Sequence, residues 1–258
     1  MRKAFSLIVA LLLSLWLVSG CLGSVAGSGN LETREFDFSD FTRVEVGNAF
    51  EVEVVQSGSF GISVTADDNI FEYLSVAKSG EMLKIRLKSG YSYSNHTAIV
   101  EISMPQLYAV EFSGATSGSV QGFSSSHDFE VELSGASSLY ITDMETGAID
   151  FDASGASSIT GNITANGDAG LNISGASSVI LSGSADDLNA DVSGASKLGF
   201  DDFTVHNADI GLSGASNGTV SMDGVLNAEV SGASRLYYIG EPALGDLDIS
   251  GGSSISKR

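Results

Sequence analysis

Apolar and polar residues alternate along the chain in front of a short motif, Ser-Gly-Ala followed by Ser or Thr, which returns about every twenty residues. The first serines of the eight copies are Ser113, Ser134, Ser154, Ser174, Ser193, Ser213, Ser231 and Ser250, and the last copy has glycine in place of alanine. Counted from that serine, positions −1 and −3 are apolar in all eight copies, and position −2 is acidic in six. Alternation with a period of two residues predicts a β-strand that buries one face.

A second alternation follows the motif in most copies, so each repeat supplies two short strands joined by a Ser-Gly-Ala corner. A unit this small cannot bury its apolar face alone and has to stack on its neighbours. Consecutive copies of each strand then lie parallel and adjacent, and glycine suits a corner because it adopts backbone angles closed to other residues. We predict an all-β fold, a right-handed parallel β-helix of about eight rungs of about 20 residues over residues 109–256. An antiparallel sandwich is the competing fold, but its strands would not need one corner sequence in every repeat.

Residues 35–108, in front of the repeat, also alternate apolar and polar residues but lack the corner motif. Glycine-bearing turns separate most of these stretches, which is typical of β-strands in a meander or of irregular first coils. The stretches are 41–55, 60–66, 83–88 and 97–104. We expect this β-strand-rich segment to cover the N-terminal end of the β-helix.

The N-terminus has the pattern of an export signal. Two cations precede an uncharged, leucine-rich run over residues 5–18, which is too short to span a bilayer and leads into Val-Ser-Gly-Cys, ending at Cys21. These four residues resemble the lipobox of prokaryotic lipoproteins, in which cleavage precedes a cysteine that carries diacylglycerol. We therefore predict a signal peptide over 1–20, a lipid on Cys21 that anchors the protein to a membrane, and a flexible tether rich in Gly and Ser over 21–34. The predicted location is extracytoplasmic, at the cell surface or in the periplasm.

The formal net charge of −20 narrows the classes of partner. Nucleic acids and anionic lipid surfaces carry the same sign, so electrostatic docking on either is disfavoured. The excess of carboxylates fits a soluble, outward-facing protein or a cation-rich setting.

The acidic side chains at position −2 are the first candidate site. They are Glu111, Glu132, Asp152, Asp191, Glu229 and Asp248. Stacked rungs would bring them about 5 Å apart, where like charges repel unless a cation or solvent screens them. Calcium accepts carboxylate ligands, although the chain lacks the Gly-Gly-x-Gly-x-Asp repeat of dedicated calcium rolls. The alternative is a solvated face that keeps the molecule soluble, and no other cofactor is expected.

A basic strand is a second feature. Lys84, Arg86 and Lys88 alternate on one strand face. They could meet the acidic column of a second molecule, or pair within the chain with Glu51 and Glu53 on a neighbouring strand.

The loop over residues 90–96 carries the third candidate, formed by Tyr91, Tyr93 and His96 among Ser and Asn. Tyrosine with Ser and Asn is the chemistry of adaptable recognition surfaces and of stacking on sugars. Many loops of this composition bind nothing specific, which is the alternative here.

Enzymatic chemistry has little support in the sequence. Lyases and hydrolases with β-helical folds need clustered carboxylates beside a positioned Arg, Lys or His. In this chain His96, His127 and His206 are scattered, and the corner period explains the Ser-Gly pairs. We expect no catalytic residues.

Several segments resemble the head GIN domain family of putative autotransporter adhesins. They are Val44-Glu45-Val46-Gly47-Asn48-Ala49-Phe50-Glu51-Val52, Ala66-Asp67-Asp68-Asn69-Ile70, Leu83-Lys84-Ile85-Arg86-Leu87 and the Ser-Gly-Ala rungs. The resemblance covers about residues 36–256, and Gly47-Asn48-Ala49 is the nearest counterpart of the family's Gly-Ile-Asn signature. It implies a β-helical extracytoplasmic domain, often on lipoproteins, with no agreed ligand and no catalytic residues.

These features predict a lipid-anchored, non-catalytic adhesion or binding module, whose partner is a glycan, an envelope polymer, another cell or a second copy of the chain. The alternative is a structural envelope protein that assembles with itself and binds no external ligand. No obvious capping segment follows the rung at residues 247–257, so open ladder ends could stack in an oligomer.

Overall fold

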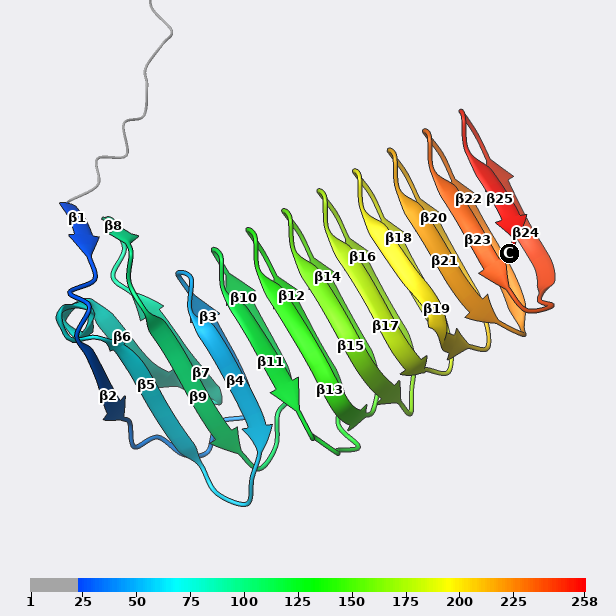
Figure 1. The fold of residues 1–258 in the computed structure, drawn as a ribbon. Helices are drawn as coiled ribbons and strands as arrows, with labels where there is room; N and C mark the ends of the chain where they lie inside the picture. Colours follow the sequence, from blue (N-terminus) through cyan, green and yellow to red (C-terminus); the bar gives the residue numbers. More distant parts are fainter. Residues whose placement is uncertain (1–22) are drawn as a thin grey trace, which may run out of the picture.

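A computed structural model describes residues 23–258, so the predicted signal peptide and Cys21 lie outside the described residues. The chain forms an elongated parallel β-helix with two large sheets and a small third one (Figure 1). Each repeat places one strand in each large sheet, and successive copies pair in parallel. The parallel β-helix predicted from the repeat is therefore confirmed. Within the described part, no helix is long and apolar enough to cross a membrane.

The first large sheet, called sheet I, holds the strand that precedes each corner. Its eleven strands, in spatial order, are β24 (Ala243–Ile249), β22 (Val225–Val230), β20 (Ala208–Leu212), β18 (Leu188–Val192), β16 (Ala169–Ile173), β14 (Ile149–Ala153), β12 (Phe129–Leu133), β10 (Ala109–Ser113), β3 (Arg43–Gly47), β7 (Met82–Leu87) and β6 (Leu74–Ser79).

Sheet II holds the strand that follows each corner. Its twelve strands, in spatial order, are β2 (Leu31–Glu35), β5 (Gly61–Asp67), β9 (Ala98–Met104), β4 (Glu51–Gln56), β11 (Ser117–Gln121), β13 (Ser138–Thr146), β15 (Ser158–Ala165), β17 (Ser178–Ser184), β19 (Lys197–Val205), β21 (Asn217–Met222), β23 (Arg235–Ile239) and β25 (Ser254–Lys257). The small sheet pairs β1 (Gly23–Ala26) with β8 (Tyr91–Ser94), and the 3-10 helix η1 spans Asp68–Glu72.

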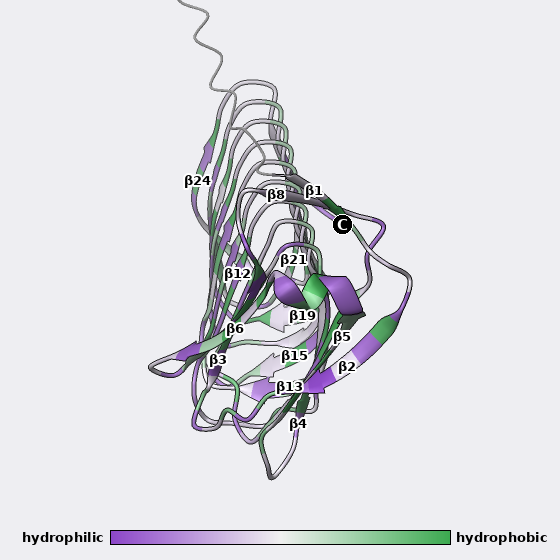
Figure 2. Cartoon of the chain, turned by 90° about the vertical axis from the view of Figure 1, so that its left-hand side faces the viewer, coloured by the Kyte–Doolittle hydropathy of each residue, from purple (hydrophilic) through white to green (hydrophobic). Residues whose placement is uncertain are grey.

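The core lies between sheets I and II. Apolar side chains at positions −1 and −3 point into it and are buried in every repeat except the last, as Ile173 and Leu171 illustrate. Polar side chains at position −2 point outward, and Figure 2 shows this alternation of hydrophilic and hydrophobic residues along the strands. The inward register read from the alternation is therefore correct for the first seven copies.

The corners stack directly on one another. Every corner glycine has a positive φ, between 69° and 78°, a region that other residues rarely adopt. A Cβ atom added at Gly135 or any later corner glycine would lie 2.3–2.6 Å from the carbonyl oxygen of the corner glycine one rung earlier. In the first seven copies the fourth residue of the motif is buried. In four of them its hydroxyl donates to the corner backbone, as when Ser157 Oγ donates to the Ser154 carbonyl at 2.7 Å. Conformation and stacking together explain why the motif recurs.

The N-terminal segment does not add its strands in chain order. Strands β3 and β4 form a rung, with the Gly47-Asn48-Ala49 counterpart at its corner, that pairs in parallel with β10 and β11 on one side. On its other side lie β7 and β9, which come from later in the chain than β3 and β4. Strands β2, β5 and β6 then pair antiparallel at the end of the sheets. The segment therefore closes the N-terminal end of the β-helix, as predicted.

Helix η1 completes this closure. It lies across the N-terminal end of the β-helix, in the foreground of Figure 2, and buries Ile70 and Phe71 in the core. The Arg34 guanidinium lies 4.1 Å from the centre of the Phe71 ring and covers it.

The segment predicted as a flexible tether, residues 21–34, is structured from Gly23 onward. β1 pairs with β8 and β2 pairs with β5. Between them, the buried Asp67 carboxylate accepts hydrogen bonds from the Gly29 amide at 2.6 Å and the Thr97 amide at 2.7 Å. These backbone hydrogen bonds hold the pKa of Asp67 below its usual value. The prediction from composition is therefore corrected for residues 23–34.

Candidate binding surfaces

The predicted acidic column forms one file on the outer face of sheet I. Glu111 lies opposite Glu132, which lies opposite Asp152, and Asp191, Glu229 and Asp248 continue the same register. Asn172 and Gly211 interrupt the file. The carboxylates therefore follow a line along the molecule, as expected from stacking. Within residues 23–258, no three His, Cys, Asp or Glu side chains gather closely enough to hold a metal ion.

A second acidic file, at position −4, lies beside the first. Glu130 lies opposite Asp150, and Asp209 occupies the same register farther along. Partial burial, then the neighbouring charges of Asp152 and Glu130, raise the pKa of Asp150. Partial burial followed by neighbouring carboxylates likewise raises the pKa of Glu111. In the sequence, this second file corresponds to acidic residues two positions before those of the first file, and these occur in fewer of the repeats.

The basic strand β7 joins the same face of sheet I. Lys84 forms an ion pair with Glu45 on the adjacent strand β3. Pairing with Glu51 and Glu53 was one of two predicted alternatives, and it is wrong because those residues belong to β4 in sheet II. The partner of Lys84, Glu45, lies on β3, which is the strand before the corner of its rung.

The predicted recognition loop is built into an aromatic cluster. Tyr91 and Tyr93 belong to β8, and both are half-buried against Tyr73, with ring centres 4.8 and 5.8 Å away. The ring of His96 lies 6.0 Å from that of Tyr93, and the Tyr93 hydroxyl donates to the Lys88 carbonyl at 2.7 Å. The three side chains are thus brought together beside β1, with only part of their surface open to solvent.

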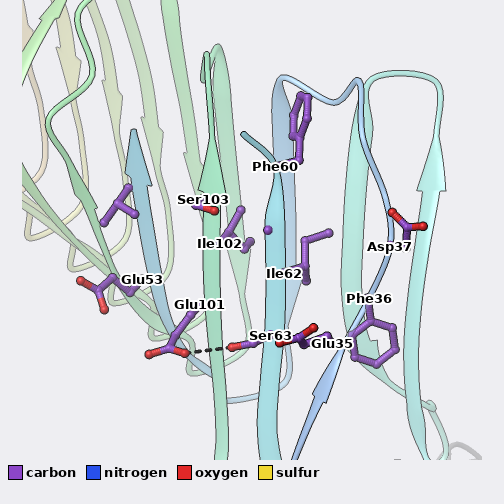
Figure 3. A pocket seen from close by; sticks show the side chains of 12 residues that line it. Glu35, Phe36, Asp37, Glu53, Phe60, Ile62, Ser63, Glu101, Ile102 and Ser103 are labelled. Carbon is purple, nitrogen blue, oxygen red and sulfur yellow. Dashed lines mark hydrogen bonds between the residues drawn. The ribbon is translucent and has the colours of Figure 1, made fainter. Parts of the chain in front are cut away.

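A groove of about 680 Å³ opens on the outer face of sheet II near its N-terminal end (Figure 3). The rings of Phe36 and Phe60 line it, and the Phe60 ring also packs against the buried Phe41 with centres 4.9 Å apart. Four carboxylates line the same groove: Glu35, Asp37, Glu53 and Glu101. Aromatic surface and hydrogen-bond acceptors thus share one open site.

Strand register explains how three of these carboxylates come together. Glu35, Ser63, Glu101 and Glu53 lie opposite one another on β2, β5, β9 and β4. Ser63 Oγ donates to Glu101 Oε2 at 2.8 Å (Figure 3). The sequence does not reveal the groove, because its residues come from four strands and the loops beside them, and the order of these strands in the sheet differs from their order in the chain.

The same row continues along sheet II away from the groove. It comprises Ser119, Tyr140, Thr160, Ile180, Gly199, Thr219, Tyr237 and Ser256. None of these side chains is charged, in contrast to the two acidic files on sheet I. Tyr140 is 54% exposed and is the first aromatic side chain beyond the groove along this row.

The histidines lie apart from the groove and from one another. His127 packs against Tyr108 with ring centres 4.5 Å apart. His206 Nδ1 lies 2.8 Å from Asp223 Oδ1, and this hydrogen bond raises the pKa of the exposed imidazole. With His96 in the aromatic cluster, no histidine lines the groove.

Residues 40–242 match the family model described as "Putative auto-transporter adhesin, head GIN domain". No curated protein sequence matches the chain.

Solved structures share the fold. A putative adhesin from Parabacteroides distasonis ATCC 8503 has a TM-score of 0.83 at 19% identity, covering 91% of this chain and 100% of its own. A putative adhesin from Parabacteroides merdae ATCC 43184 has a TM-score of 0.78 at 18% identity, with coverages of 91% and 99%. A protein from P. distasonis named a putative lipid binding protein has a TM-score of 0.76 at 21% identity, with coverages of 91% and 99%.

Proposed function

Because this chain belongs to the head GIN domain family of putative auto-transporter adhesins, we propose that it is a non-catalytic, extracytoplasmic binding module for a neutral glycan. The observation that carries this proposal is the groove of Figure 3, in which carboxylates and two phenylalanine rings line one open site on sheet II. The names of the similar solved structures, two putative adhesins and a putative lipid binding protein, also favour binding over catalysis.

The chemistry of the groove suits sugar hydroxyl groups. Ionised carboxylates only accept hydrogen bonds, and hydroxyl groups donate them. The exposed parts of Phe36 and Phe60 offer apolar surface to the C–H faces of a sugar ring. Because no Lys or Arg lines the groove, an anionic polymer would meet uncompensated repulsion there.

The row beyond the groove suits a long polymer better than a short ligand. Five steps between adjacent strands separate Glu35 from Tyr140, which is about 24 Å at about 4.8 Å per step. A glycan lying along the helix axis would contact the groove carboxylates at one end and the Tyr140 ring farther on. A lipid ligand fits less well, because side chains such as Phe200 and Phe203, with ring centres 4.4 Å apart, fill the space between the sheets.

The test is capture of polysaccharides by the protein, with neutral and anionic polymers compared at one ionic strength. Tyr140→Ala should weaken binding of a neutral polymer about two- to tenfold, the range for one aromatic contact. Glu101→Gln, which alters the groove, should weaken it as well. The matched control is Asp191→Asn on the opposite face, which should bind as the wild type does. Unchanged binding by both Tyr140→Ala and Glu101→Gln, or capture of anionic polymers alone, would refute the proposal.

We also propose that a lipid on Cys21 anchors the module to a membrane. The support is the lipobox-like sequence that ends at the only cysteine of the chain. Cys21→Ser should move the protein from the membrane fraction to the soluble fraction of cells that express it. Continued membrane retention of that variant would contradict lipidation.

A further inference from the structure

The C-terminal end of the β-helix is uncovered in the structure. Leu244, Leu247 and Ile249 on β24 are 53%, 36% and 48% exposed. The residues opposite them on β22, Leu226, Ala228 and Val230, are at most 4% exposed. A following rung covers the positions on β22, whereas no described rung follows β24, so the last described rung presents apolar core surface to solvent.

The same end presents unpaired backbone. β24 and β25 are edge strands, each hydrogen-bonded to one neighbour only among the described residues (Figure 1). An edge strand is a template for pairing with another chain, and sheet proteins usually shield such edges. This end therefore combines two edges with an apolar surface between them, which is what a further rung would cover.

At the N-terminal end of the β-helix, in contrast, the core is covered. There η1 buries Ile70 and Phe71 beneath the antiparallel strands, and the chain itself supplies the covering elements. Strands β6 and β2 end the two sheets there and are edges too, but the cap covers the core between them. A C-terminal end stacked on this end would therefore not bury its apolar surface against another core. The structure therefore favours contact between two identical ends over a filament.

We propose that two copies of the chain join through their C-terminal ends, with β24 of one copy pairing antiparallel to β25 of the other. The two strands of a rung run in opposite directions (Figure 1). Half a turn about an axis parallel to the strands would therefore bring β24 of each copy beside β25 of the other. Each large sheet of one copy then continues into a sheet of the other. This is a closed two-fold interface, because the same surface serves both copies.

The charges on the two strands favour pairing of β24 with β25 over pairing of β24 with β24 of the other copy. Asp246 and Asp248 on β24 are exposed, and β25 carries Lys257, followed by Arg258. Pairing β24 with its own copy would set four carboxylates close together, which is unfavourable. Pairing β24 with β25 instead brings those carboxylates toward the cations, which in a single copy already contact Glu241 and Asp201.

The experiment is thiol cross-linking with a short bis-maleimide in intact cells that express the full chain. Asp248→Cys and Ser256→Cys place thiols on the outward faces of β24 and β25, and Cys21 is common to every variant. The double variant should give a covalent dimer, and each single variant should not. The matched control is the double variant Asp152→Cys/Thr160→Cys, which occupies the same two registers on an interior rung and should stay monomeric.

A second substitution tests whether the apolar surface drives the contact. Leu247→Lys, introduced into the Asp248→Cys/Ser256→Cys protein, should abolish the covalent dimer. Because Leu247 is partly exposed in the single copy, the variant should keep its circular dichroism spectrum, and glycan capture by the distant groove should be unchanged. A double variant that gives no dimer, a Leu247→Lys variant that still gives it, or cross-linking by Asp248→Cys alone would each overturn the proposed interface.

Discussion

Replacing one corner glycine by alanine should separate the two reasons for the repeated motif. Gly175 has φ +75°, and an added Cβ would lie 2.4 Å from the Gly155 carbonyl oxygen. That oxygen also accepts the 2.8 Å hydrogen bond from the Ala176 amide that joins the two corners. Gly175→Ala thus imposes a disfavoured backbone conformation and also pushes apart two stacked rungs.

A second glycine provides the matched control. Gly122 has φ +79°, yet an added Cβ there would have no atom within 4 Å. Holding alanine in the left-handed region costs roughly 1–2 kcal/mol at either position. Forcing an extra carbon into a packed site costs typically about 1–3 kcal/mol more. We therefore expect a loss of about 1–2 kcal/mol for Gly122→Ala and about 2–5 kcal/mol for Gly175→Ala.

The free energy of unfolding is measured by urea denaturation followed by far-ultraviolet circular dichroism. The difference between the two variants reports the stacking contact alone, because the backbone contribution is common to both. Equal losses for the two variants would show that only backbone conformation demands glycine at the corner. A loss for Gly175→Ala smaller than that for Gly122→Ala would contradict the close corner stacking itself.

Three further predictions concern the core, the acidic face and the N-terminal cap. Ile173→Asp should cost about 3 kcal/mol or more. Asn172→Asp on the outer face should lower Tm by only about 1–3 °C, because it adds a solvated carboxylate between Asp152 and Asp191. Wild-type melting of Ile173→Asp would contradict the inward register. Asp150→Asn should raise Tm at neutral pH by about 1–3 °C, because the raised pKa means that ionising Asp150 costs stability. That gain should vanish as the pH falls below the ordinary carboxyl pKa, and an undiminished gain there would refute this cause. Asp67→Ala should speed hydrogen exchange at the Gly29 amide, which loses its acceptor. In the wild type, protection of the same amide should be lost as the pH falls through the lowered pKa of Asp67. Unchanged exchange would show that this carboxylate does not hold residues 23–34 in place.

The repeat made most of the β-helix predictable. Once equivalent residues stack rung on rung, alternation alone decides which side chains point inward, as it does for Ile173 and Leu171. It also decides that Glu132 lies beside Glu111. The last copy departs from the pattern because burial depends on the next rung, and Ile249 has none within the described residues.

The N-terminal cap could not be predicted in the same way. Pairing of β7 with β3 joins segments far apart in the sequence and leaves no periodic signal, so the sequence does not show that Lys84 lies beside Glu45. The glycine content of residues 23–34 predicts flexibility, yet a Cβ at Gly27 would lie 2.5 Å from the Asn95 carbonyl oxygen. That glycine permits close packing. Composition alone does not distinguish these two uses of the residue.

The position of the β3–β4 rung has a consequence for biogenesis. A ribosome makes this rung before either of its neighbours, so both of its edges stay bare until β7–β9 on one side and β10–β11 on the other have been synthesised. Closing these distant contacts is slower than adding later coils, each of which needs only the coil made just before it. The polypeptide is therefore most prone to misassembly while the edges of the β3–β4 rung are still unpaired. A chaperone that shields this rung would protect the chain during its slowest assembly step.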